Sequence, residues 1–504
     1  MKNQKKIGIV LSYLNLFINM TVNVLLTPAL IACLGDDSYS IYKVMQSFAG
    51  PLIMFNLGIS AIVTRAVIKY HVSDEHNELE KRNTLALGMI ISLIMAIFVL
   101  CLSAVMYSQI PRIYGHNYSE VLINEGKRVF ALFALSTIFN ILTETFRGCV
   151  LGNEKYLFNT SIPLFRNLFR IGIMSACILL KMGAAEIAFV DFIMSLAVFV
   201  IYAIYSLFVL QERPKLTSVN KSEIISIASF AFAILLQTIV NQVNNNVDTM
   251  LLGAMVEEKS TITMYSSALV IYTVYNSLIS VVAEILLPKA SQLVERKASG
   301  KEYTDFVVAP GRFQAMLAIA IVIAFALFGK DFIELWIGTE YQDAYYIVLM
   351  LIIPVTIPLV ENAAICILDA SMKRIYRSGV LVGMAIANVA TSIVLIRILG
   401  FWGAALGTVI SLVIGHVFLM NLYYKKVFGM EIGRMFKEIF SGILSVGIIA
   451  GILCIPLTFI DNTILFFLVK CLAFVLIYGI LLWRYGMKEN EKILLIGRTQ
   501  RSTN

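Results

Sequence analysis

Six amide side chains recur at every fourth residue inside two apolar stretches of the sequence: Asn15, Asn19, Asn23, Gln237, Asn241 and Asn245. A spacing of four residues places each set of three on one face of an α-helix. Polar groups at membrane depth are costly unless they face other protein or water, so both faces predict a polar cavity. Amides offer a donor and an acceptor, which suits the hydroxyl groups of a sugar. Hydrogen bonding between helices is the alternative interpretation.

Two arginines have the same spacing in a third apolar stretch, residues 159–181. Arg166 and Arg170 share a helix face and lie roughly 10–16 Å along the helix, at 1.5 Å per residue. That depth is too great for either side chain to reach the membrane surface easily. A planar guanidinium binds phosphate oxygens bidentately, so the pair predicts a site for a phosphate or pyrophosphate. The alternative is an internal salt bridge with Glu144 or Asp191.

Asp248 follows Asn245 by three residues and therefore lies on the same predicted helix face. An intramembrane carboxylate is a candidate proton carrier, cation ligand or arginine partner, and a packing contact between helices is the alternative. Glu144 and Arg147 stand three residues apart, and we expect them to pair with each other. All three are candidates for ion coupling or gating.

No nucleophile–base combination, metal-ligand spacing or paired carboxylates stand out in the rest of the sequence, and no phosphate-binding G-x-x-x-x-G-K-[ST] motif occurs. We therefore expect no catalytic residues, no metal and no cofactor. An energy source other than ATP is expected, and a proton or sodium gradient is the candidate.

The composition defines the class of protein. Of 504 residues, 59% are hydrophobic and only 14% are charged, with a mean hydropathy of +0.83. Soluble proteins are about one quarter charged. Long apolar runs recur throughout the sequence, so we predict an all-α polytopic membrane protein. The net charge of +8 comes from basic residues in short loops, where they set topology, and does not predict a nucleic-acid partner.

About fourteen transmembrane helices are predicted, near residues 8–32, 41–64, 84–108, 127–148, 159–181, 184–210, 224–255, 262–287, 313–336, 343–369, 378–398, 402–424, 439–460 and 463–485. Most of the 40 lysines and arginines fall on one side when both termini are placed in the cytoplasm. Pro354 and Pro358 could bend the tenth helix just before Glu361.

The two amide sets differ by a constant offset, since 237 − 15 = 222 and 241 − 19 = 222. The loop residues 113–115 and 335–338 differ by about the same number. Six spans per unit is even, which predicts two parallel six-helix repeats around a central cavity. The expected divisions are an N-terminal lobe (1–215), a C-terminal lobe (216–425), and two extra helices with a tail (426–504).

Three segments resemble bacterial polysaccharide transporters: NLGIS at 56–60, VDTMLLG at 247–253 followed by MYSSA at 264–268, and FGKDFIELWIGTEY at 328–341. The set resembles the Wzx-type polysaccharide and O-antigen flippases of the multidrug/oligosaccharidyl-lipid/polysaccharide superfamily, which are MATE-like. Asp248 occupies the aspartate position of the second motif. The resemblance does not extend to the arginine positions.

The resemblance implies a flippase that moves an undecaprenyl-pyrophosphate-linked oligosaccharide to the outer leaflet by alternating access, for export of capsule, exopolysaccharide or O-antigen. It also implies a multi-pass protein of the bacterial cytoplasmic membrane, with membrane lipids, a polysaccharide polymerase and chain-length machinery as partners. We expect a monomer. The alternatives are a MATE-type drug/cation antiporter, a lipid II flippase, and a membrane glycosyltransferase or polymerase, for which no acidic cluster or large outer loop is present.

Overall fold

The computed structural model describes residues 2–56, 58–72, 78–216, 246–280, 286–371 and 374–496, together with the single residues 235, 238 and 242. All regular structure among these residues is helical. Contacts divide the chain into two compact units, Met1–Ser266 and Ser267–Asn504, and each is described by itself.

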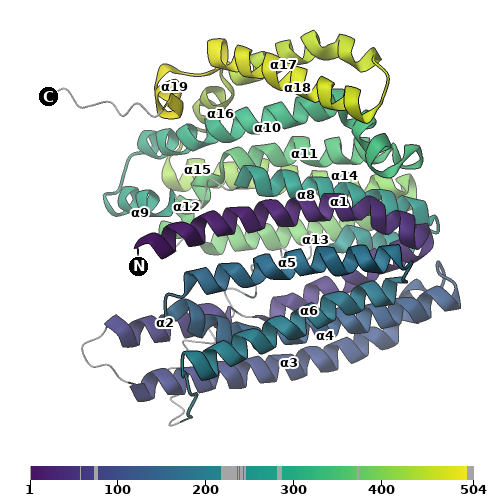
Figure 1. Cartoon of the computed structure of the whole chain (residues 1–504). Helices are drawn as coiled ribbons and strands as arrows, with labels where there is room; N and C mark the ends of the chain where they lie inside the picture. Colours follow the sequence, from purple (N-terminus) through teal and green to yellow (C-terminus); the bar gives the residue numbers. More distant parts are fainter. Residues whose placement is uncertain are drawn as a thin grey trace. The chain divides into compact units, whose positions relative to one another are not determined.

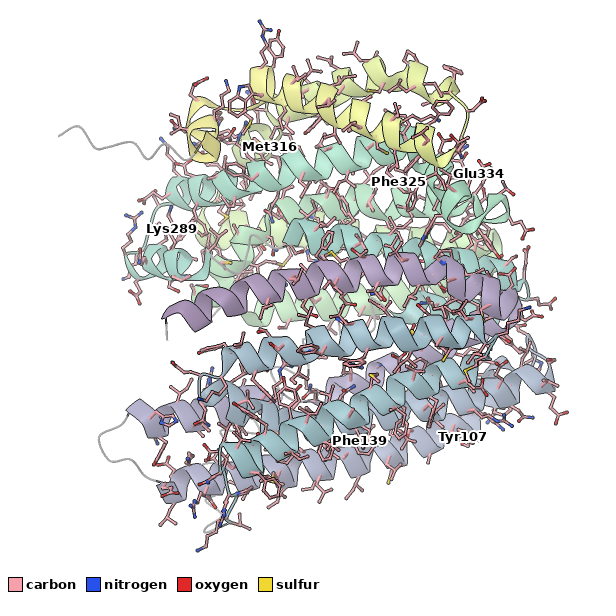
Figure 2. The ribbon with its side chains drawn as sticks, in the orientation of Figure 1. Tyr107, Phe139, Lys289, Met316, Phe325 and Glu334 are labelled. Carbon is pink, nitrogen blue, oxygen red and sulfur yellow. The ribbon has the colours of Figure 1, made fainter. Side chains whose placement is uncertain are left out.

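The first unit is built from long helices. They are α1 (Lys2–Ala49), the 3₁₀ helix η1 (Gly50–Asn56), α2 (Ile59–Val72), α3 (Glu78–Tyr114), α4 (Glu120–Gly152), α5 (Tyr156–Leu179), α6 (Ala184–Ile204) and the π-helical turn η2 (Tyr205–Val209). In this unit α4 packs on α2, α3 and α6, and α1 packs on α5 (Figure 1). Tyr107 lies on α3 and Phe139 lies on α4 (Figure 2).

Glycines allow these helices to approach closely. A Cβ placed on Gly148 of α4 would lie 2.6 Å from the Cβ of Val63 on α2, so any larger residue would force the helices apart. Gly35 interrupts α1 with φ 68° and ψ 171°, a conformation essentially restricted to glycine. Gly35 therefore marks a kink between two helices, the second of which ends at Ala49, and η1 and Gly58, whose φ is 63°, interrupt the helix again.

The break at Gly35 lies between the predicted spans 8–32 and 41–64, as expected for two separate helices. The predicted span 41–64 is interrupted again at 50–58, so it comprises the last part of α1, η1 and the start of α2. Pro51 lacks an amide hydrogen and Gly58 adopts a positive φ, so the break lies where the backbone tolerates it best.

The second unit contains the remaining helices. They are α8 (Lys259–Ser280, which begins in the first unit), α9 (Leu287–Glu295), α10 (Gly300–Ile337), η4 (Thr339–Tyr341), α11 (Ala344–Val360), α12 (Asn362–Ala370), α13 (Arg374–Leu399), α14 (Phe401–Leu412), η5 (Val413–Met420), α15 (Asn421–Phe428), α16 (Ile432–Phe440), α17 (Ile443–Cys454), η6 (Ile455–Phe459), α18 (Ile464–Leu481), η7 (Leu482–Gly486) and α19 (Glu489–Ile496).

Helix α10 is the central element of this unit. Met316, Phe325 and Glu334 follow one another along it (Figure 2). Its N-terminus carries a capping box, in which Ser299 and Glu302 satisfy each other's backbone amides. Helices α17 and α18 pack along α10 (Figure 1).

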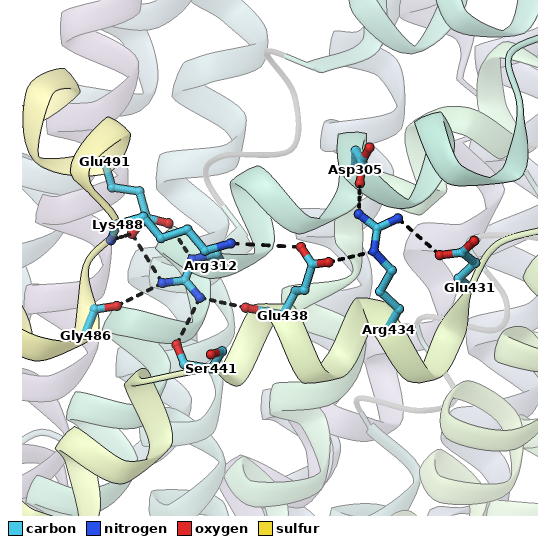
Figure 3. A network of polar contacts seen from close by, with 9 residues as sticks. All are labelled: Asp305, Arg312, Glu431, Arg434, Glu438, Ser441, Gly486, Lys488 and Glu491. Carbon is cyan, nitrogen blue, oxygen red and sulfur yellow. Dashed lines mark hydrogen bonds and ion pairs between the residues drawn. The ribbon is translucent and has the colours of Figure 1, made fainter.

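Two ion pairs connect the C-terminal helices to α10. Arg312, 2% exposed, donates to Glu491 on α19 and to the carbonyls of Glu438, Ser441 and Gly486 (Figure 3). Figure 3 also shows Arg434 bridging Asp305, Glu431 and Glu438 on the exposed side of the same network. Near the other end of α10, Lys470 of α18 lies 2.7 Å from Asp331.

The predicted bend of the tenth span is confirmed. Helix α11 ends at Val360, and α12 leaves it at 47°. Pro354 and Pro358 each remove an intrahelical hydrogen bond just before this break. Glu361 lies at the break and is 2% exposed.

Eleven helices in the described part of the chain are long and apolar enough to cross a membrane, or twelve if α11 and α12 form one bent span. One of them, Leu14–His71, covers most of the predicted span 8–32 and all of the predicted span 41–64. Most of the predicted seventh span lies outside the described residues. Large apolar side chains stay exposed, such as Leu465, Leu468 and Ile480 on α18 at 60–69%. This is an all-α, multi-pass integral membrane protein.

Candidate functional site

A polar pocket of about 380 Å³ opens within the first unit. Its walls come from α1, η1, α4, α5, α6 and residue 242. The lining residues are Asn19, Gln46, Ala49, Gly50, Ile53, Phe133, Ser136, Thr137, Asn140, Arg166, Asn167, Arg170, Asp191, Ser195 and Gln242. Amides, hydroxyls and two guanidiniums dominate this lining, so the pocket suits a polar, anionic ligand.

Arg170 forms a salt bridge inside the pocket. Its Nε lies 2.6 Å from Oδ1 of Asp191 on α6, and its Nη2 lies 3.3 Å from Oδ2. The Arg170 and Asp191 side chains are 19% and 10% exposed. Glu144 and Asp191 are the two acidic partners considered for the arginines, and Arg170 pairs with Asp191 of α6. A guanidinium has five N–H donors, so this pairing leaves several of them available to a ligand.

Arg166 has a different environment, although it lies one turn from Arg170 on the same helix. Its Nη2 donates to the hydroxyl of Ser195 at 3.3 Å. Lys43 of α1 lies near Arg170 and Asp191 and packs against the Tyr39 ring, 5.5 Å from its centroid. Three cationic side chains therefore gather around one aspartate, which leaves this part of the unit with excess positive charge.

The three amides of the first set, Asn15, Asn19 and Asn23, have different surroundings in the structure. Asn19 lines the pocket, whereas the Oδ1 atom of Asn15 accepts a hydrogen bond from the Asn167 side chain at 3.0 Å. Asn23 donates to Asn19 at 3.2 Å and is exposed. One side of α1 thus reaches the polar pocket, and an amide–amide bond joins it to α5.

The second set, Gln237, Asn241 and Asn245, lies outside the described residues. Two neighbouring amides are described. Gln242 lines the pocket, and Asn246 donates to the Gln242 side chain at 2.9 Å.

Asp248 is buried, with 3% exposure, and accepts a hydrogen bond of 2.7 Å from the Tyr265 hydroxyl. It does not line the polar pocket. The donor of this hydrogen bond is a neutral hydroxyl. This arrangement differs from the ion pair of Asp191.

Glu144 and Arg147 of α4 pair with each other at 3.4 Å, as their spacing predicts. Arg147 also donates to Asn159 of α5 at 3.3 Å and is exposed. The described lining of the polar pocket includes neither residue.

Several lining residues were not singled out from the sequence. Gln46 and Asn140 are amides inside apolar runs, and the rule that drew attention to the two amide sets applies to them as well. Ser136 and Thr137 gave no such signal, because a hydroxyl in a membrane helix can satisfy itself on the preceding turn. Both do so here, with bonds of 2.9 and 3.0 Å.

Solved structures resemble the chain over most of its length. The lipid II flippase MurJ in an inward closed conformation matches with a TM-score of 0.72 at 16% identity, covering 98% of this chain and 100% of that chain. An inward-facing multidrug resistance MATE family transporter matches at 0.64 and 12% identity, covering 82% and 96%. The eukaryotic MATE transporter AtDTX14 matches at 0.56 and 12% identity, covering 86% and 100%. At these identities the likeness shows the fold alone, which is MATE-like.

No curated protein matches the sequence at a significant level. A family model described as polysaccharide biosynthesis protein matches residues 6–294. That stretch contains 289 residues (294 − 6 + 1), more than half of the 504, and includes the polar pocket. This match shows that the chain belongs to the polysaccharide biosynthesis protein family, and the chain has a MATE-like fold.

Proposed function

We propose that this protein is a flippase that moves an undecaprenyl-pyrophosphate-linked oligosaccharide from the cytoplasmic to the outer leaflet, by alternating access, for export of a surface polysaccharide. The observation that carries the proposal is the excess positive charge in the polar pocket. Arg166 faces a serine and Arg170 faces a single aspartate, so one carboxylate offsets two guanidiniums. An anionic ligand supplies the missing countercharge.

The pocket also provides for a sugar next to the anion. Asn19, Asn140 and Asn167 lie in the same lining as the arginines and present both donors and acceptors. In the proposed complex the pyrophosphate contacts Arg166 and Arg170, and the first sugars contact the amides. Asn15, Asn23, Gln237, Asn241 and Asn245 complete the polar surface in this proposal.

The proposed architecture is that of fourteen spans in two parallel six-helix repeats, with two further helices at the C-terminal side. In this proposal both termini face the bacterial cytoplasm and the protein acts as a monomer beside a polymerase and chain-length machinery. Asp248 is the proposed coupling residue for a proton or sodium gradient, with the Glu144–Arg147 pair as a gating contact. The buried position of Asp248 against Tyr265 supports this role.

The test is depletion of the protein in its native cell, followed by analysis of lipid-linked intermediates on each leaflet. We expect one undecaprenyl-pyrophosphate oligosaccharide to accumulate on the cytoplasmic leaflet, with loss of the matching surface polymer. Re-expression of Arg166→Gln should fail to reverse the accumulation, whereas re-expression of Arg434→Gln, which changes a partly exposed arginine of the second unit, should restore export. Unchanged lipid intermediates after depletion would refute the proposal.

A lipid II flippase is the second candidate, favoured by the likeness to MurJ over 98% of the chain. Its cargo also carries a pyrophosphate, so the same pocket would serve. Depletion distinguishes the two, because lipid II would accumulate and cell-wall synthesis would stop. A drug/cation antiporter is disfavoured by the cationic pocket, and depletion would then lower resistance to cationic drugs without changing the lipids.

A further inference from the structure

A second cavity lies beside the polar pocket on the same two helices. It is an apolar groove of about 380 Å³, lined by Val22, Leu25, Leu26, Ala29, Ile171, Ser175, Ile178 and Leu179. Four of these residues belong to α1 and four to α5. Nothing in the polar pocket's proposed role accounts for it.

The groove continues the faces that line the polar pocket. On α1, Asn19 lines the pocket, and Val22, Leu26 and Ala29 follow at steps of three, four and three, so all lie on one helix face. On α5, Asn167 lines the pocket, and Ile171 and Ser175 follow at steps of four. Along both helices the side chains therefore change from polar to apolar in the same direction.

Two contacts fix the ends of this α1–α5 pair. Asn167 donates to Asn15 at the pocket end, and the thiol of Cys33 lies 3.8 Å from the carbonyl of Ile178 at the other end. The residue numbers of the partners rise together, so the helices run parallel. Between the two contacts, the small side chains of Ala29 and Ser175 leave room for the groove.

The groove has a buried floor and an open rim. Val22 and Leu26 are 5% and 8% exposed, whereas Leu25 and Leu179 are 66% and 83% exposed. The distance along α5 from Arg170 to Leu179 is roughly 14 Å, nine residues at 1.5 Å each. An amphiphile with its charged group at Arg170 would therefore have an apolar channel leading directly away from that group.

We propose that the α1–α5 groove binds the first isoprene units of the polyprenyl chain of the cargo, next to the pyrophosphate. The inference rests on the proposed function, because it requires the pyrophosphate at Arg166 and Arg170. Continuity with the polar pocket argues for this occupant over a bulk phospholipid, whose acyl chains would need no cationic pocket at one end. By holding the junction between the polyprenyl chain and the pyrophosphate, the groove would fix the position of the cargo relative to the polar pocket.

The experiment measures binding of two probes to the full chain in lipid nanodiscs: undecaprenyl pyrophosphate and inorganic pyrophosphate. Leu26→Trp and Ala29→Trp fill the groove. We expect each to weaken undecaprenyl pyrophosphate binding at least tenfold and to leave inorganic pyrophosphate binding unchanged. The matched control is Leu476→Trp on α18, an exposed apolar position (56%) outside the groove, which should change neither.

A second measurement does not depend on the folding of a variant. A polyprenyl pyrophosphate with a photoreactive group near the pyrophosphate is crosslinked to the wild-type protein, and the labelled residues are mapped. Labels concentrated on 22–29 and 171–179 support the proposal. Labels elsewhere, equal competition by excess phosphatidylglycerol, or groove variants that bind undecaprenyl pyrophosphate normally would overturn it. If the Arg166→Gln variant bound inorganic pyrophosphate as well as the wild type does, that result would instead refute the proposed function.

Discussion

Arg170 and Asp191 form a two-point ion pair between α5 and α6, whereas Arg166, one turn away, meets only the hydroxyl of Ser195 in the described part of the chain. Two arginines at i and i+4 thus have different tasks. Arg170 holds two helices together and keeps some donors for a ligand, while Arg166 forms no ion pair of its own and shares the charge of Asp191 with Arg170. The two residues can be separated experimentally.

For ligand binding, we expect Arg166→Gln to weaken pyrophosphate affinity roughly ten- to one-hundredfold. A hydrogen bond to a charged group contributes about 1.5–3 kcal/mol, and each 1.4 kcal/mol is a factor of ten. Thermal stability should change little, because Arg166 loses only a serine contact. Titration calorimetry with undecaprenyl pyrophosphate measures the affinity. An unchanged affinity would remove Arg166 from the site.

For stability, we expect Arg170→Gln to lower the free energy of unfolding by roughly 1–3 kcal/mol, less than for a fully buried pair because both side chains keep some exposure. The loss should come from Asp191, left partly buried without its partner. Arg170→Gln combined with Asp191→Asn should therefore recover stability without recovering transport. Thermal unfolding in detergent measures stability, and a transport assay measures activity. Recovery of both stability and transport in the double variant would contradict this separation.

Asp248 is predicted to link transport to an ion gradient. Asp248→Asn keeps the size of the side chain and can still accept the Tyr265 hydrogen bond. We expect transport by this variant to lose its dependence on the gradient, while binding of pyrophosphate stays within twofold of wild type. Transport into proteoliposomes with imposed proton or sodium gradients measures this. A variant that responds to both gradients as wild type does would exclude Asp248 as the coupling residue.

The backbone conformation at Gly35, and not the space around it, is predicted to require glycine. A Cβ placed on this residue would meet no neighbouring atom within 4 Å. Its φ of 68° and ψ of 171° are costly for any other residue, so Gly35→Ala should destabilise the protein by about 1–3 kcal/mol. Gly172 on α5 has equally open space and no positive φ, and Gly172→Ala should be neutral or slightly stabilising. Equal melting temperatures for the two variants would contradict this account.

Arg312 is predicted to be the most sensitive position of the second unit. Arg312→Ala removes bonds to Glu491 and to three backbone carbonyls, and should cost about 3–5 kcal/mol because the site is buried. Arg434 has three acidic partners where Arg312 has one, but it is about one third exposed, so Arg434→Ala should cost less than about 1 kcal/mol. Melting temperatures of the two variants test this, and a similar loss in both would show that burial does not decide the outcome.

The sequence predicts the membrane helices well, because apolar run length is set by the bilayer and needs no knowledge of packing. It also predicts the arginine pair and the contact of Glu144 with Arg147, since both follow from helical spacing. It leaves Glu144 and Asp191 equally open as partners of α5, because that choice depends on how α4 and α6 pack. Gln46 and Asn140 were missed although the rule for polar groups inside apolar runs applies to them as well. The roles of the amide sets stay predictions.

Helix α10 is held by α17–α19 at two distant points, Arg312 and Asp331. The sequence places the last two predicted spans outside the two six-helix repeats. Their ion pairs with α10 indicate a structural role for these helices. If they were removed, Arg312 and Asp331 of α10 would lose their ion-pair partners Glu491 and Lys470, so these helices stabilise α10. We therefore expect these helices to move together with α10 as one rigid body in any conformational change of the second unit.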